Sequence, residues 1–88
     1  EAMQNKAMEM GFNEQQARLL VLQTALGSAE MVKQNPDIAL STLRENVTSK
    51  GGTTAEGVRT LKELGLPETV AKAMQAVADR GEEMEKLF

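Results

Sequence analysis

The chain has 88 residues and a net charge of −3, with 10 basic and 13 acidic residues and neither cysteine nor histidine. This length allows one small domain, and the lack of a basic block disfavours nucleic acid as a partner. Without these two residue types the chain has no disulfide, no thiol nucleophile, no histidine base and no common zinc ligand, so we expect it to hold no metal. The sequence also shows no long apolar run and no signal-like N-terminus. We therefore expect a soluble, cytoplasmic protein that does not contact a membrane.

Two helices are predicted in the first part of the chain. Good helix formers favour a helix over residues 2–10, and Gly11 follows as a residue that can end it. Asn13 is a good N-cap for the second helix, with Gln16 three residues later, where a capping box has Glu or Gln. This second helix is predicted to run through Val32.

The second helix contains an uninterrupted apolar run, Leu19-Leu20-Val21-Leu22. Apolar neighbours in direct succession face nearly every side of a helix, so nearly every side needs to be covered. A chain of 88 residues offers few partners for this. The run therefore indicates an oligomer, and the alternative is a central helix that the other helices of the same chain enclose.

Three more helices are predicted after Gln34. Asn35 and Pro36 indicate the start of the third, as N-cap and N1 residue, and it should end near Val47. Thr53 and Glu56 form a second capping box for the fourth, which ends at Gly65. The fifth opens with Pro67 at N1, and its apolar residues recur at helical spacing, at Val70, Ala73, Met74, Val77, Gly81, Met84 and Phe88. No segment alternates with period two, so the predicted fold is all-α with about five helices.

The loop before the fourth helix, residues 47–54, reads VTSKGGTT. Gly51 and Gly52 would present backbone N–H groups at the positive end of a helix dipole, an arrangement that binds carboxylate or phosphate. Ser49, Thr53 and Thr54 add hydroxyl groups. The segment is neither a P-loop nor a GxGxxG motif. An anion site and a plain turn with an N-cap both remain open from the loop alone.

Two segments resemble one known family. Residues 45–58 resemble the signature loop and helix of pyrroline-5-carboxylate reductases, and residues 23–32, QTALGSAEMV, are similar to the family's Q-T-x-x-G-x-x-x-M helix. The resemblance extends over residues 1–88. It implies that these residues are the C-terminal helical dimerisation domain, with interleaved helices, of a longer two-domain reductase. No Rossmann domain is then present in this chain.

The resemblance also implies the activity and the partners. The family reduces 1-pyrroline-5-carboxylate to L-proline in proline biosynthesis, with NADPH or NADH held by the N-terminal domain. No residue of this chain would then bind the cofactor, and the isolated 88 residues are expected to be inactive. The expected partner is a second copy, in a homodimer that assembles further into decamers in many members.

The same resemblance assigns roles to the residues of the loop. The substrate carboxylate would be held by the hydroxyl of Ser49 and by backbone N–H groups around Gly51, Gly52 and Thr53. Thr54 would be the catalytic residue, with its hydroxyl directed at the ring nitrogen. The family most often has Pro where this chain has Lys50, which leaves the loop less rigid and brings a cation near the carboxylate.

Two other interpretations remain open. Residues 8–17, MEMGFNEQQA, also resemble the first helix and loop of a ubiquitin-associated domain, which would make the chain a binding module and no part of an enzyme. The helix after Ala17 is long and apolar for such a domain. The third interpretation is a structural helical oligomerisation domain whose glycine loop binds nothing.

Overall fold

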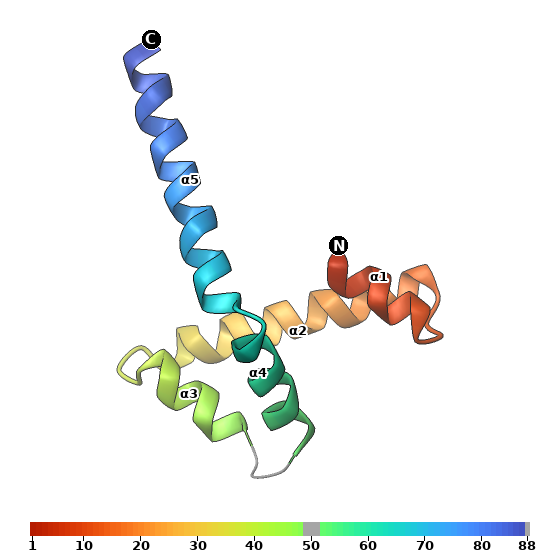
Figure 1. Ribbon diagram of the computed structural model, residues 1–88. Coiled ribbons are helices and arrows are strands. Elements are labelled where there is room, and N and C mark those ends of the chain that lie inside the picture. The colour runs from red at the N-terminus through yellow and green to blue at the C-terminus, as the bar shows by residue number, and fades with distance from the viewer. Residues whose placement is uncertain (49–51, 88) are drawn as a thin grey trace. The chain divides into compact units, whose positions relative to one another are not determined.

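The computed structural model describes residues 1–48 and 52–87, and Figure 1 traces the helices that they form. In this part of the chain there are five α-helices and no strand, so the predicted all-α class is confirmed. Their bounds are Ala2–Glu9 for α1, Glu14–Gln34 for α2, Leu40–Val47 for α3, Thr53–Glu63 for α4 and Leu66–Leu87 for α5. The chain divides into two compact units, Glu1–Arg44 and Glu45–Phe88.

The turn between α1 and α2 closes α1 as predicted. Gly11 has a φ of 113°, a conformation that glycine adopts without strain. The N–H of Gly11 donates to the carbonyl of Met8 at 3.1 Å, and the N–H of Phe12 donates to the carbonyl of Ala7 at 3.2 Å. These two bonds are the Schellman motif, which satisfies carbonyls at the end of a helix. The chain then reverses, so that α1 packs along the first half of α2.

The start of α2 also follows the prediction. The backbone N–H of Gln16 donates to Oδ1 of Asn13 at 2.9 Å, and the backbone N–H of Asn13 donates to Oε1 of Gln16 at 3.0 Å. This reciprocal capping box satisfies two donors that the helix itself leaves unpaired. Both residues are therefore confirmed in their predicted roles.

The predicted start of the third helix is wrong. Asn35 does not cap α3; its Nδ2 donates to the carbonyl of Met31 at 2.7 Å, and this closes the end of α2. The N–H of Ile38 donates to the carbonyl of Asn35 at 3.1 Å, which makes a turn, and α3 begins only at Leu40. An asparagine side chain can accept at a helix start or donate at a helix end, and the sequence does not say which it will do.

The junction of α4 and α5 depends on Gly65. This residue has a φ of +88°, and its N–H donates to the carbonyl of Lys62 at 3.2 Å, so Gly65 ends α4 as predicted. Its carbonyl then accepts the N–H of Thr69 at 3.0 Å, in the first turn of α5. One glycine thus ends one helix and begins the next. Helix α5 opens at Leu66, one residue before the predicted Pro67.

Few side chains are buried. Among the described residues, only Ala17 and Leu43 are buried apolar side chains, and both lie in the unit Glu1–Arg44. Leu19, Leu20 and Leu22 on α2 remain 56 %, 46 % and 50 % exposed. Isolated apolar side chains on a surface are ordinary, but a contiguous apolar face usually marks an interaction site. Within the unit Glu1–Arg44, the leucines of the apolar run of α2 are therefore about half uncovered.

Candidate functional site: the N-terminus of α4

The described part of the predicted site lies at the start of α4. Gly52 is the N-cap, with an extended backbone (φ −83°, ψ 173°), and its carbonyl accepts the N–H of Glu56 at 3.3 Å. Thr53 and Thr54 are the first two residues of α4, and both are exposed. The first N–H groups of a helix have no carbonyl partner within the helix, so Thr53 and Thr54 present donors at the positive end of the dipole.

The remaining predicted site residues lie outside the described residues. These are Ser49 and Gly51, together with Lys50, the position that departs from the family pattern. The structure therefore brings together Gly52, Thr53 and Thr54 as consecutive residues of one helix start. The expectation that a glycine directly precedes the fourth helix is confirmed, since Gly52 stands immediately before α4.

The predicted capping box of α4 is wrong. Gly52, and not Thr53, is the N-cap, and among residues 1–48 and 52–87 no side chain makes a capping hydrogen bond to the start of α4. The second glycine already has the extended conformation that an N-cap needs, so the helix begins one residue earlier than a threonine cap would allow. The hydroxyl of Thr53 is therefore not used to cap α4.

Glu56 makes a different contact from the predicted one. Its carboxylate pairs with Arg59 through both oxygens, and Nη1 of Arg59 also contacts Oε1 of Glu63 at 2.8 Å. The hydrogen bonds that the guanidinium donates to Glu56, and then to Glu63, raise the pKa of Arg59 above its ordinary value. Exposed pairs of this kind add little stability. Arg59 does, however, offset the negative charge of Glu56 near a helix start where an anion would bind.

The ion pairs of Arg59 with Glu56 and Glu63 were not predicted, although the spacing of the three residues indicates them. Glu56, Arg59 and Glu63 are spaced i, i+3 and i+7, so all three side chains lie on one face of a helix. The capping-box pattern predicted that Glu56 would bond to the backbone, and its pairing with Arg59 was therefore not considered. Local charge spacing would have been the better guide.

The difference between the two helix starts gives a stability prediction. Asn13→Ala should lower the free energy of unfolding by about 1 kcal/mol, because it removes a side-chain cap from α2. Thr53→Ala should change it by less than about 0.5 kcal/mol, because an exposed hydroxyl without a capping role is lost. Urea unfolding of both variants at one fixed protein concentration measures this. Equal losses in the two variants would contradict the assignment of Gly52 as the cap.

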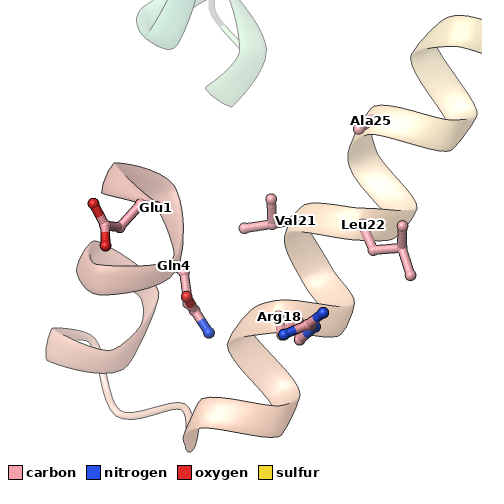
Figure 2. A pocket seen from close by; sticks show the side chains of 6 residues that line it. All are labelled: Glu1, Gln4, Arg18, Val21, Leu22 and Ala25. Atoms are coloured by element: carbon pink, nitrogen blue, oxygen red, sulfur yellow. The ribbon is translucent and has the colours of Figure 1, made fainter.

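A second feature is an open depression on the unit Glu1–Arg44, with a volume of about 290 Å³. It is lined by Glu1, by Gln4 of α1, and by Arg18, Val21, Leu22 and Ala25 of α2, which Figure 2 labels. It contains none of the residues predicted to bind a ligand. Two of its residues on α2, Val21 and Leu22, belong to the apolar run, so it fits apolar side chains of a partner better than a charged ligand.

The described residues were also considered for a metal site and for a membrane-spanning helix. Within residues 1–48 and 52–87, no group of three acidic side chains is placed to hold a metal ion. None of the helices found there is both long and apolar enough to cross a membrane. The arrangement that remains is a helix start with backbone donors and two hydroxyl groups. Such a site can hold an anion and can donate a hydrogen bond to a polar atom beside it.

Comparison with known proteins assigns the chain to a family. Residues 1–84 match the family described as pyrroline-5-carboxylate reductase dimerisation. The whole chain is 65% identical to a protein named pyrroline-5-carboxylate reductase from Vibrio alginolyticus and 54% identical to one from Pasteurella multocida, and it covers 32% of each. It is 33% identical to pyrroline-5-carboxylate reductase 2 of Bacillus subtilis, over 31% of that protein. The chain thus spans about a third of the length of these relatives.

Proposed function

This chain belongs to the pyrroline-5-carboxylate reductase family, as its dimerisation domain, and we propose that it supplies the dimer contacts and part of the substrate site of an enzyme that reduces 1-pyrroline-5-carboxylate to L-proline. The observation that carries this proposal is the family match over residues 1–84, together with 65% identity over the full 88 residues to a relative of that name. Proline biosynthesis is the pathway that this reaction serves.

The proposed enzyme is longer than the present chain. Residues 1–88 correspond to about a third of each relative, so the cofactor is expected to bind elsewhere in the complete protein. The electron donor is NADPH or NADH, and an N-terminal dinucleotide domain would hold it. The role of this chain is then to hold one end of the substrate and to join two copies of the enzyme.

The start of α4 is proposed to bind the substrate carboxylate. The N–H groups after Gly52 are free of intrahelical partners, and the dipole of α4 favours a negative charge there. Gly52 has no side chain to keep a ligand from the backbone. Ser49 and Gly51 complete this site in the proposal. A carboxylate can be held in this way without an arginine or a histidine.

Thr54 is proposed to act at the ring nitrogen. In the reaction, hydride from the reduced nicotinamide forms a C–H bond at the imine carbon, and the nitrogen gains a proton as the C=N double bond becomes single. A hydroxyl that hydrogen bonds to this nitrogen can orient the ring and pass a proton to it. Thr54 is exposed in the first turn of α4, one residue after Thr53, so its hydroxyl is available for this contact.

The proposal is tested by the oxidation of NADPH in the presence of 1-pyrroline-5-carboxylate. A complete enzyme that contains residues 1–88 as its C-terminal domain should consume NADPH and form L-proline. The isolated 88-residue chain should bind no NADPH and show no turnover. An inactive complete enzyme that is correctly folded would refute the proposed reaction, and turnover by the isolated chain would refute the proposed division of roles.

A further inference from the structure

Helix α4 carries an acidic side chain close to its N-terminus. The carbonyl of Gly52, the N-cap, accepts the N–H of Glu56 at 3.3 Å, so Glu56 lies one turn after the residue that begins the helix. Side chains on a helix lean toward its N-terminus, and Gly52 has no side chain to stand in the way. The carboxylate of Glu56 can therefore reach the N–H groups that are proposed to bind the substrate carboxylate.

In the structure this carboxylate is bound by an arginine instead. Nε of Arg59 donates to Oε2 of Glu56 at 3.3 Å, and Nη2 of Arg59 contacts Oε1 of the same carboxylate. Nη1 of Arg59 also contacts Oε1 of Glu63 at 2.8 Å, so one guanidinium joins two carboxylates. Among the described residues no side chain, that of Glu56 included, makes a capping hydrogen bond to the start of α4. The helix start is therefore left open on this side.

Without Arg59, the carboxylate of Glu56 would oppose a bound anion in two ways. It would compete for the backbone donors at the start of α4, because a carboxylate suits that end of the helix dipole. It would also repel a second carboxylate by its uncompensated charge. The side chains of Arg59 and Glu56 are 54% and 65% exposed, and ion pairs this exposed add little stability. The pair therefore has a larger expected effect on an anion at this helix start than on the fold.

We propose that Arg59 is a positioning residue of the substrate site, which holds the carboxylate of Glu56 away from the start of α4 and leaves that start open to the substrate carboxylate. The inference rests on the proposed function, because it takes the start of α4 as the carboxylate site. Arg59 acts through Glu56 and does not itself touch the substrate. Its loss should therefore weaken the binding of the substrate and leave the rate of the chemical step unchanged.

The test is a double-mutant cycle in the complete enzyme that contains residues 1–88. Steady-state rates are measured with varied 1-pyrroline-5-carboxylate at saturating NADPH. Arg59→Gln should raise KM about threefold or more with little change in kcat, because it releases the carboxylate of Glu56 beside the site. Glu56→Gln should keep KM at or below the wild-type value. The double variant Glu56→Gln/Arg59→Gln should return KM to within about twofold of the wild type, because the competing carboxylate is gone.

The matched control is Arg80→Gln. Nη1 of Arg80 contacts Oε2 of Glu83 at 2.9 Å on α5, and both side chains are as exposed as those of the α4 pair. This variant removes the same charge and the same kind of ion pair from another helix, so it should leave KM and kcat unchanged. Circular dichroism of each variant should show the wild-type fold, since exposed pairs add little stability.

The outcomes separate this inference from the proposed function. A wild-type KM in Arg59→Gln would overturn the inference and leave the proposed reaction in place. A raised KM that the double variant keeps would also overturn it, because Arg59 would then act on the substrate without Glu56. A raised KM in Glu56→Gln would do the same, because Glu56 would then assist binding. A folded wild-type enzyme that does not reduce 1-pyrroline-5-carboxylate would refute the proposed function itself.

Discussion

Leu22→Asp is expected to dissociate the 88-residue chain and to unfold much of it. Leu22 is 50 % exposed in a single copy, and it lines the depression on α2 shown in Figure 2. If a second copy covers this surface, the new carboxylate would be buried there without a partner. That costs several kcal/mol, which is comparable to the whole stability of a small domain. Leu20→Asp should act in the same way, because Leu20 belongs to the same apolar run.

The control for this prediction is Gln15→Asp. Gln15 is an exposed polar residue in the first turn of α2, where a carboxylate suits the helix dipole. This variant adds the same charge to the same helix and should keep the wild-type mass and helicity. Sedimentation and circular dichroism measure both quantities. A Leu22→Asp chain with wild-type mass and helicity would show that no partner covers α2 at this point.

Thr54→Ala in the complete enzyme should lower kcat by about a hundredfold or more. A positioned group that transfers a proton contributes roughly this factor, and the side chain of Thr54 is proposed to contact the nitrogen that becomes protonated. Because Thr54 is exposed and makes no cap, the free energy of unfolding should change by less than about 0.5 kcal/mol. The loss should appear in kcat and kcat/KM together, since the contact strengthens in the transition state.

Two further variants make this prediction specific. Thr54→Ser keeps a hydroxyl and should recover much of the lost turnover. Thr60→Ala removes another hydroxyl of α4, one that donates to the carbonyl of Glu56 at 2.9 Å, and it should leave turnover unchanged. Steady-state rates with 1-pyrroline-5-carboxylate and NADPH compare the three. Wild-type turnover in Thr54→Ala would remove Thr54 from the proposed chemistry.

The helix ends that were predicted correctly are those that local chemistry determines. Gly11 and Gly65 both have positive φ values, which only glycine adopts easily, so each marks a helix end wherever the rest of the chain lies. The Asn13 and Gln16 capping box is likewise complete within four residues. Such features depend on neighbouring residues alone, and a sequence shows neighbouring residues directly.

The two incorrect helix starts have a common cause. Asn35 and Thr53 are both residue types that can cap the start of a helix, but in each case a different local interaction sets the helix boundary. Asn35 closes α2, and Gly52 begins α4 before Thr53 can. Composition alone does not decide between such competing local hydrogen bonds. The prediction for Glu56 failed for the same reason, because its carboxylate pairs with Arg59 instead of capping the start of α4.

The structure of the candidate site was predictable only in part. The glycines before α4 indicated a helix start with free donors, and Gly52, Thr53 and Thr54 are found there. The proposed roles of these residues, at the substrate carboxylate and at the ring nitrogen, rest on family resemblance, because a helix start by itself does not specify a ligand. The same resemblance favours the reductase over the ubiquitin-associated interpretation of residues 8–17, and the family match over residues 1–84 agrees with it.

The most direct test of the central claim, that this chain is a dimerisation domain, is its mass in solution. One copy has a mass of 9.6 kDa, and within the unit Glu1–Arg44 the side chains of Leu19, Leu20 and Leu22 on α2 are about half exposed. Sedimentation equilibrium over a wide concentration range should give at least twice this mass, with little dissociation at low concentration. A folded, helical chain that sediments as a 9.6 kDa monomer at every concentration would contradict the account.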